Sequence, residues 1–242
     1  MKFVKFIFFI FLVFIYISII IYYFKNIQFS NNNELELDLI IPSRLSDIVI
    51  VLRHKEFYKR FLNYSKIVLI GPNIIQENLL NDTSIEIFPE DKILPKKKIN
   101  DFLLQMRNLT TSRDGWYEQQ FLKMGYSRFC KKNYYLIWDV DTIPIKPINL
   151  FENNHPFFDM KIEHHIPYFN AINRLIPGLK FANQSYISEH MMVKTELMKN
   201  LLDNIEKNDG IPGKLFWEKI LMAIDVPYKK EKEEENTEIF SS

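Results

Sequence analysis

Residues 134–147 read YYLIWDVDTIPIKP, and this stretch decides the fold. It opens with five apolar or aromatic residues, a short β-rich run that is typical of a strand buried in the middle of a sheet. Asp139 and Asp141 follow, on either side of Val140. On an extended backbone the two carboxylates would project to the same side, because side chains alternate between the faces of a strand. Two prolines then end the regular structure.

The position of the two acids predicts a ligand site. Open α/β sheets bind their ligands at the carboxyl ends of the strands. Two like charges this close are costly unless a cation neutralises them. A hard divalent ion, Mg²⁺ or Mn²⁺, held also by substrate phosphates, is the simplest explanation. The alternative is structural, with Asp139 as a cap or loop acid and Asp141 as a turn residue, since a bare Asp-x-Asp pattern often arises by chance.

Composition narrows the class of protein. Of the 242 residues, 47% are hydrophobic and 15% aromatic, which indicates a folded domain with a sizeable core. The formal net charge is +1 and no basic stripe is interleaved with aromatics, so nothing points to a nucleic-acid partner. The single cysteine, Cys130, excludes an internal disulfide and a cysteine-based zinc site. The sequence contains neither a P-loop nor a GxGxxG fingerprint.

The first 25 residues predict a membrane anchor. Residues 6–24 contain only Ser18 as a truly polar side chain, and at ~1.5 Å per residue they would span a bilayer core. Lys2 and Lys5 favour a cytoplasmic N-terminus. A cleaved signal peptide is the alternative, but no small-x-small cleavage site follows. We therefore expect an uncleaved signal anchor, a single-pass type II membrane protein, and a bulk that faces the Golgi or ER lumen.

Glycosylation sequons fit that orientation, although an asparagine-rich chain also produces them by chance. A glycoprotein is the corresponding expectation. The sequons begin at Asn63, Asn81, Asn108 and Asn183.

The rest of the chain alternates strand-like and helix-like segments. This alternation predicts βαβ units and an α/β fold with a mostly parallel sheet. The expected parts are a polar stalk (26–46), one domain (47–228) and a charged tail (229–242). The expected strands are 47–52, 66–72, 84–89 and 157–161, beside the central run, and the expected helices are 56–63, 115–124, 195–206 and 213–224.

Two further clusters carry chemistry. His164 and His165 stand beside Glu163, but adjacent side chains seldom bind one metal and no H-x-x-x-H spacing is present, which disfavours zinc. A loop that faces an acceptor, or an ordinary polar surface, fits them better. Glu189 and His190 lie shortly before a predicted helix, where a hydrogen-bonded helix start is the alternative to a direct chemical role.

Four stretches together carry a family resemblance. They are similar to an uncharacterised glycosyltransferase-like family with the GT-A, nucleotide-diphospho-sugar transferase fold, a Rossmann-type mixed, mostly parallel sheet flanked by helices. The resemblance runs from about Asp47 to Ile224. The stretches are GWYEQQFLKMGYS (115–127), YYLIWDVDTIPIKP (134–147), FFDMKIEHHIPYF (157–169) and SYISEHMMV (185–193).

The resemblance implies a hexosyltransferase-like enzyme that moves a sugar from a nucleotide-sugar donor to a glycan, protein or lipid acceptor. Asp139 and Asp141 match the family's DxD motif, in which Mn²⁺ or Mg²⁺ bridges the donor diphosphate. His190 would be a further metal ligand, and Glu189 the catalytic acid or base. The expected donor contacts are Leu52, Arg53, His54, Gln120, Trp138, Asp139 and Val140, and the expected acceptor contacts are His164, His165 and Tyr168.

Three alternatives stay open. The family pattern continues past residue 242, so a truncated domain end is expected. A haloacid-dehalogenase-type phosphatase would use Asp139 as nucleophile and Asp141 as general acid, but its motif opens the domain, whereas this one follows three predicted strands. A non-catalytic, membrane-anchored protein that binds sugar nucleotides on a degenerate GT-A scaffold is the remaining alternative.

Overall fold

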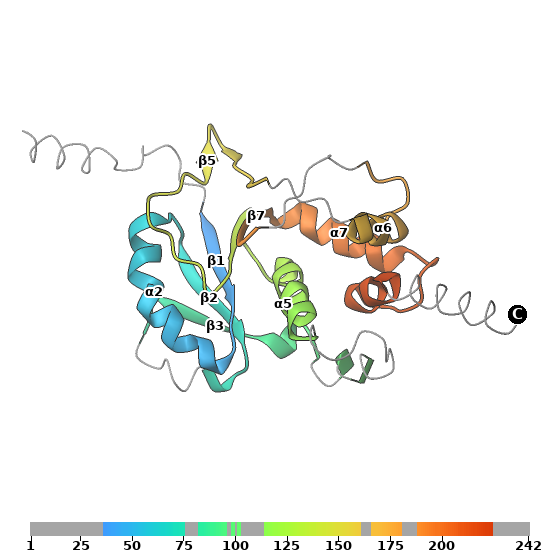
Figure 1. The fold of residues 1–242 in the computed structure, drawn as a ribbon, viewed down its shortest axis with the longest axis horizontal. Helices are drawn as coiled ribbons and strands as arrows, with labels where there is room; N and C mark the ends of the chain where they lie inside the picture. The colour runs from blue at the N-terminus through green and yellow to red at the C-terminus, as the bar shows by residue number, and fades with distance from the viewer. Residues whose placement is uncertain are drawn as a thin grey trace, which may run out of the picture. The chain divides into compact units, whose positions relative to one another are not determined.

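A mixed sheet of five strands lies at the centre of the protein (Figure 1). The computed structural model of the chain describes residues 36–75, 82–95, 98–99, 101–102, 114–160, 166–180 and 188–224. The strands are β1 (Leu37–Pro42), β2 (Lys66–Gly71), β3 (Ile85–Pro89), β4 (Tyr134–Trp138) and β7 (His190–Lys194). Their order in space is β3-β2-β1-β4-β7. The first four are parallel and β7 is antiparallel to β4, which confirms the mixed, mostly parallel α/β sheet.

Helices cover both faces of this sheet (Figure 1). α2 (Ile48–Phe61) packs on one face. α5 (Asp114–Gly125), α7 (Thr195–Lys207) and the helical residues 216–224 pack on the other. The pleat of β1 divides its side chains: Leu39 and Ile41 join the core under α2, and Ile40 joins the core under α5. Burial on both faces explains why β1, β2 and β4 read as nearly continuous apolar runs.

Short elements connect these layers. The hairpin after β4 turns through Asn153 and Asn154, whose φ angles of 50° and 66° lie in the left-handed region that asparagine adopts more readily than most residues. The connecting elements are η1 (Leu45–Asp47), η2 (Glu90–Lys92), η3 (Tyr126–Arg128), β5 (Phe151–Glu152), β6 (His155–Pro156) and α6 (Ile166–Leu175).

The first strand is not where the sequence analysis placed it. Residues 47–52, predicted to be a buried strand, belong to η1 and α2. The strand of this region is β1, which lies inside the segment 26–46 that was expected to be a stalk. Ile48 and Val51 are buried one helical turn apart, so packing on the sheet overrides the strand preference of their β-branched side chains.

A second difference follows the β5–β6 hairpin. Residues 157–160, part of the predicted strand 157–161, have no regular secondary structure. Phe157 and Phe158 are both about half exposed, so they do not alternate between a core and solvent as strand residues would.

None of the helices formed by the described residues is long and apolar enough to cross a membrane. The predicted anchor (residues 1–25) and the predicted tail (229–242) both lie outside the described ranges. Those two predictions therefore stay predictions.

Candidate functional site

The order of the strands reverses between β1 and β4. From β1 the chain runs through α2 to β2 and β3 on one side, and returns through α5 to β4 on the other side of β1. Such a switch point opens a crevice at the carboxyl ends of the two strands, where open α/β sheets bind ligands. Here the two ends are Ser43–Arg44, after β1, and Asp139, after β4.

A cavity of about 510 Å³ lies at this carboxyl edge, beside the first turns of α5. That volume falls within the ~300–1,000 Å³ typical of small-molecule sites. Its lining comes from the segments that follow β1, β2 and β3 and from α5. The polar and aromatic members that face it include Ser43, Arg44, Asp47, Trp116, Glu118 and Gln119.

Two glycines let the segments around this carboxyl-edge cavity approach closely. A Cβ on Gly71, at the end of β2, would collide with the backbone carbonyl of Ser43. A Cβ on Gly115, in the first turn of α5, would collide with the guanidinium group of Arg44. The backbone N–H of Arg44 donates to the Asp47 carboxylate at 2.8 Å, and the N–H of Asp47 donates back to the Arg44 carbonyl at 3.0 Å. The loop after β1 is therefore held against the start of α5.

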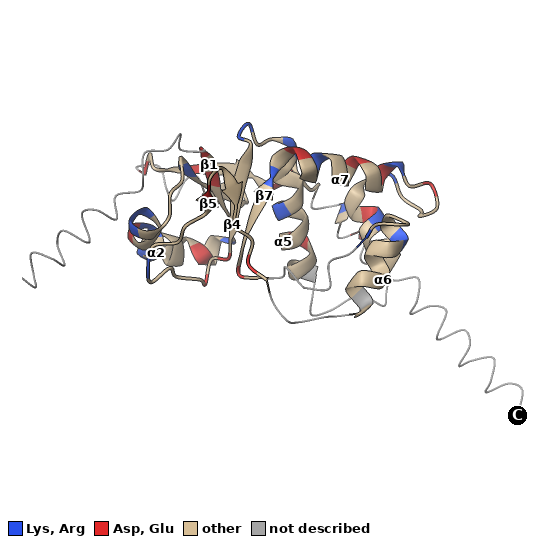
Figure 2. Cartoon of the chain, turned by 90° about the horizontal axis from the view of Figure 1, so that it is seen from above, with Lys and Arg blue, Asp and Glu red and all other residues tan. Residues whose placement is uncertain are grey.

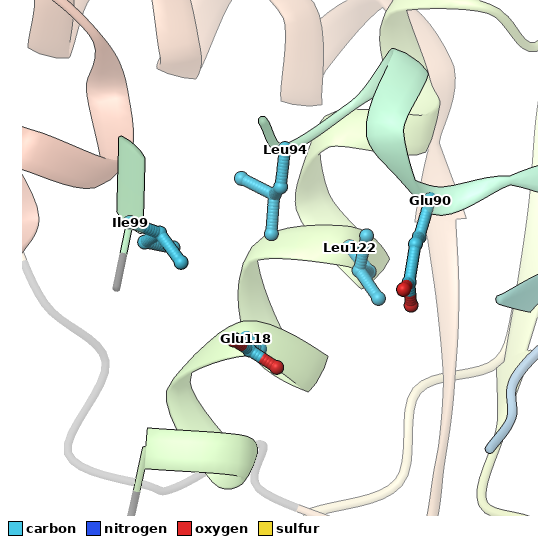
Figure 3. A pocket seen from close by; sticks show the side chains of 5 residues that line it. All are labelled: Glu90, Leu94, Ile99, Glu118 and Leu122. Carbon is cyan, nitrogen blue, oxygen red and sulfur yellow. The ribbon is translucent and has the colours of Figure 1, made fainter. Parts of the chain in front are cut away.

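A small recess of about 10 Å³ adjoins the cavity (Figure 3). It has room for about one water molecule. Glu90, Glu118 and Leu122 line both the recess and the cavity, so the two are continuous. Leu94 and Ile99 form the apolar side of the recess (Figure 3).

The turn after β4 sets the direction of the two predicted acids. β4 ends at Trp138, and the N–H of Thr142 donates to the carbonyl oxygen of Asp139 at 3.0 Å, which closes a turn. The prediction that an extended backbone carries Asp139 and Asp141 to the same side is therefore wrong, because the chain turns between them. This turn, residues 139–142, is called the DVDT turn below.

Asp139 forms an ion pair with a lysine that the sequence analysis did not select. Lys123 Nζ lies 2.6 Å from Asp139 Oδ1, and the two side chains are 9% and 28% exposed. The Tyr135 hydroxyl donates to the backbone carbonyl of Lys123 at 3.0 Å, which ties the end of α5 to β4. Helical spacing places Lys123 on one face with Trp116 and Gln120, but only the packing of α5 against the sheet shows that this face meets Asp139.

Asp141 lies on the side of α2. Burial, followed by the nearby negative charge of Asp141, raises the pKa of the Tyr58 hydroxyl well above its usual range. Tyr58 packs edge-on against Trp138, with ring centroids 6.0 Å apart. Trp138 Nε1 donates to the carbonyl of Thr142 at 2.8 Å. The aromatic side chains thus support the DVDT turn from beneath, and Trp138, which is buried, acts as a support rather than as the predicted donor contact.

The predicted donor contacts at residues 52–54 do not lie at the end of a strand. Leu52 and Arg53 are exposed positions within α2. His54 lies on the same helix, with its Nδ1 3.5 Å from the Tyr58 hydroxyl. None of these three predicted contacts lines the carboxyl-edge cavity.

Two other predicted donor contacts, Gln120 and Val140, do not line the carboxyl-edge cavity. Gln120 is half-buried in α5 and does not line the cavity, whereas its neighbour Gln119 does. Val140 packs on the core under α2. Helical spacing alone does not decide which of two adjacent glutamines faces a cleft, because the rotation of α5 is set by its contacts with the sheet.

Glu189 and His190 do lie beside the DVDT turn. The N–H of Asp139 donates to the carbonyl oxygen of Glu189 at 3.0 Å. His190 pairs with Trp138 across the sheet, and the two rings are 5.0 Å apart. Glu189 directly precedes the edge strand β7 and His190 is its first residue, so neither lies at a helix start, since α7 begins only at Thr195.

The predicted acceptor contacts are described only in part. His164 and His165 lie outside the described residues. Tyr168 is half-buried in α6 and does not line the carboxyl-edge cavity.

The three predicted metal ligands do not fit a shared metal centre in this arrangement. Asp139 is paired with Lys123. Asp141 lies toward Tyr58, and the ring of His190 packs against an indole. Within the ranges that the structure describes, no three His, Cys, Asp or Glu side chains are grouped so as to hold an ion. Carboxylate oxygens suit Mg²⁺ and Mn²⁺, but an ion at Asp139 would have to displace an ammonium group.

Basic and acidic side chains are mixed on the described helices, so charge does not indicate a second binding face there. Lys and Arg occur on α2, α5 and α7 with Asp and Glu among them (Figure 2). This mixture agrees with the formal net charge of +1.

A second acid lies buried near the amino end of the sheet. Asp38, in β1, is 3% exposed, and its Oδ2 accepts a hydrogen bond from the Tyr126 hydroxyl at 3.0 Å. The buried Cys130 thiol lies 4.0 Å from the same oxygen. Burial raises the pKa of the Asp38 carboxyl above its ordinary value of 3.8. Its Oδ1 has no hydrogen-bond partner among the described residues.

One family covers most of these elements. The family described as "Family of unknown function (DUF6492)" matches residues 43–228. The chain belongs to this family. The match contains the loop after β1, α5, the DVDT turn and β7, so the carboxyl-edge cavity is part of the family's own domain. No curated protein matches the chain.

Two solved structures are similar to the chain at low identity. Mannosyl-3-phosphoglycerate synthase from Rubrobacter xylanophilus is 12% identical, with a TM-score of 0.28, over 47% of this chain and 33% of that one. The galactosyltransferase LgtC, in complex with donor and acceptor sugar analogs, is 8% identical, with a TM-score of 0.42, over 78% of this chain and 70% of that one. The chain thus spans only a third of the synthase. Similarity at these TM-scores does not indicate what this chain does.

Proposed function

We propose that the chain is a glycosyltransferase that binds a nucleotide-sugar donor in the carboxyl-edge cavity. The observation that carries the proposal is the place of this cavity, at the carboxyl ends of β1, β2 and β3 of a mostly parallel sheet, the edge at which α/β proteins bind their ligands. The stretches that resemble GT-A glycosyltransferases form α5, the DVDT turn and the approach to β7. Resemblance and cavity therefore meet at the same edge of the sheet.

The lining of the cavity suits a nucleoside diphosphate. The Arg44 guanidinium has the planar geometry that binds phosphate oxygens in pairs. Trp116, which is 42% exposed, offers an aromatic face for a base. The first turn of α5 adds backbone N–H groups and the positive end of the helix dipole. Carboxylates in the lining provide acceptors for ribose hydroxyls.

In this proposal Asp139 faces the diphosphate end of the donor, and Lys123 is the positioning residue that fixes the direction of its carboxylate. Glu189 is the candidate acid or base toward the acceptor, because its backbone is bonded to Asp139. Dependence on Mn²⁺ or Mg²⁺, with Asp139, Asp141 and His190 as ligands, stays a prediction from the sequence. No step is assigned to the ion, since the Asp139 carboxylate already forms an ion pair with Lys123.

Donor binding is the direct test. The full chain is screened against a panel of nucleotide sugars by thermal shift, with and without Mn²⁺. A ligand that binds only the folded state raises the melting temperature by mass action. We expect a rise with one nucleotide sugar or a small group of them, and transfer or hydrolysis of that donor. A folded sample that binds no donor would overturn the proposal.

Two arginines give a matched control for where the donor binds. Arg44→Gln should weaken donor binding, because Arg44 lines the cavity. Arg53→Gln should leave it unchanged, because Arg53 is an exposed position on α2 and does not line the cavity. The reverse result would return the donor site to residues 52–54, as the sequence analysis had it.

The ion pair between Lys123 and Asp139 favours a second candidate, a protein that binds sugar nucleotides without transferring the sugar. An acid that is paired with a fixed ammonium group can balance the charge of a binding site without taking part in catalysis. Donor binding with neither transfer nor hydrolysis would decide for this candidate.

Membrane anchorage by residues 1–25 and a lumenal orientation complete the proposal. They rest on the sequence alone. A shift in electrophoretic mobility after removal of N-linked glycans would test the lumenal side, and its absence would count against it.

A further inference from the structure

A second pocket lies along β4 and β7, on the face of the sheet opposite to α5. Its volume is about 190 Å³. Leu136 and Met192, which pair across the two strands, form its buried floor. The segment after β4 forms its other side, and a backbone hydrogen bond of 3.0 Å from Phe157 to Leu150 holds that segment in place. We call it the β7 pocket; its lining also includes Asn149, Phe157, Phe158, Asp159 and His190.

The β7 pocket combines apolar surface with a few polar groups. Phe157 and Phe158 are 48% and 50% exposed, which is unusual for a neighbouring pair of large apolar side chains. Asn149, Asp159 and His190 add an amide, a carboxylate and an imidazole to the lining. A mainly apolar lining with a small number of polar groups is typical of small-molecule sites.

The size and charge of the β7 pocket narrow the ligand. A volume of about 190 Å³ is below the ~300–1,000 Å³ of sites for drug-sized molecules, so one ring fits and a nucleotide does not. Of the described residues that line it, none is Lys or Arg, which disfavours a phosphate or another anion. A neutral ring with an apolar face and hydroxyl groups at its edge matches both the phenyl rings and the polar groups. A pyranose has this chemistry.

One end of the β7 pocket lies close to the carboxyl edge of the sheet. His190 lines the pocket and stacks on Trp138, the residue directly before the DVDT turn. The pocket therefore ends beside Asp139, whose N–H is bonded to the residue before His190. The β7 pocket lies on the α2-covered face of the sheet, whereas the donor cavity is lined by α5 and by the segments after β1, β2 and β3.

We propose that the β7 pocket binds a pyranose ring of a neutral carbohydrate acceptor. This inference rests on the proposed transferase function and adds the chemical class of the acceptor. Phe158 and Asp159 are its specificity-determining residues, the first for the apolar face of the ring and the second for its hydroxyl groups. The sequence analysis had placed the acceptor at His164, His165 and Tyr168, further along the same connection.

The test measures binding of a panel of methyl pyranosides to the full chain without donor, by saturation-transfer difference NMR. We expect at least one pyranoside to bind, and Phe158→Ala and Asp159→Asn each to weaken it about tenfold or more. Phe57→Ala is the matched control, since Phe57 is 44% exposed on α2 and lies outside the pocket lining. Melting temperatures establish that the variants fold.

Donor binding is measured in the same variants, so that the two proposals fail separately. Loss of pyranoside binding with donor binding retained supports the acceptor site. Pyranoside binding that is absent, or unchanged in both variants, overturns the acceptor site while a bound donor leaves the proposed function standing. If no donor binds to the wild-type chain, the proposed function fails and the acceptor role fails with it.

Discussion

Asp38 lies in β1 and Asp139 directly follows the neighbouring strand β4, both on the α5-covered side of the sheet, yet their surroundings differ. Asp38, in β1, is buried, receives one hydrogen bond from a tyrosine hydroxyl and has a raised pKa. Asp139, directly after β4, is partly exposed and paired with an ammonium group at 2.6 Å. Burial raises the pKa of the Asp38 carboxyl despite the nearby charge of Lys66, whereas the Asp139 carboxylate lies directly against an ammonium group. The difference separates an acid that belongs to the core from one that is available to a ligand.

The largest expected effect is on the exposed acid. Asp139→Asn removes the negative charge that is paired with Lys123, so transfer should fall about 100- to 1,000-fold, as when a preorganised charge is lost from an active site. Rates of donor turnover measure this. Asp38→Asn should leave the rate unchanged, and equal losses in both variants would remove the distinction between the two acids.

Lys123 should have the next largest effect. Lys123→Met frees the Asp139 carboxylate to rotate, and loss of a positioning partner typically costs about 10- to 100-fold in activity. Lys123→Arg keeps the positive charge and should restore part of the rate. If both variants lose stability and activity in proportion, Lys123 has only a structural role.

The Lys123→Met variant also tests whether Asp139 can bind a metal ion. With Lys123 replaced by Met, Asp139 has no cation, so Mn²⁺ should bind the variant more tightly than the wild-type chain. Electron paramagnetic resonance of free Mn²⁺ gives both affinities without any activity assay. Equal affinities would mean that Asp139 takes no part in binding the ion.

For the buried acid Asp38, removal of its hydrogen-bond partner Tyr126 should reduce the stability of the protein. Tyr126→Phe removes the hydrogen bond from the tyrosine hydroxyl to the Asp38 carboxyl, leaves only the longer contact with the Cys130 thiol among those described, and should lower the free energy of unfolding by about 1–3 kcal/mol, the usual cost of leaving a buried polar group unsatisfied. Chemical denaturation measures this. Donor binding should not change, and a large loss of binding would connect this end of the sheet with the site.

The smallest effect is a dependence of stability on pH. Because burial raises the pKa of Asp38 in the folded state above 3.8, folding favours the protonated carboxyl. Its contribution to stability is fully present below pH 3.8 and is lost as the pH rises through the folded pKa. Asp38→Asn lacks this titration, so the wild type should lose stability relative to the variant over that range. Parallel curves of unfolding free energy against pH would show that Asp38 titrates normally.

The sequence predicted three of the five strands of this sheet, β2, β3 and β4, from their apolar runs, and it missed β1 and β7. The runs at 66–72, 84–89 and 134–138 are nearly continuous in apolar residues, and each forms a strand within a residue of its expected bounds. The helix predicted at 115–124 is likewise confirmed. The run 47–52 failed because its β-branched residues read equally well as a strand and as the buried stripe of a helix.

The site was predicted less completely than the fold. The sequence selected Asp139, Glu189 and His190, and the structure brings these three together around one turn. It did not select Arg44 or Lys123, which come from a loop and a helix far from the DVDT turn in sequence. Arg44 lies outside the four stretches that carry the resemblance, and Lys123 lies inside one of them, but a single basic residue gives no signal of its role until its partner is known.

The amino-acid sequence by itself determined that β2, β3 and β4 are strands of a buried sheet and that two acids follow β4. Local composition is enough for this, because burial on both faces and the turn-forming residues leave their marks within a few positions. The tertiary structure alone decided that β1 lies beside β4, that the chain turns between Asp139 and Asp141, and that Lys123 faces Asp139. These features depend on how helices rotate and strands are ordered, which is fixed by contacts between segments distant in the chain.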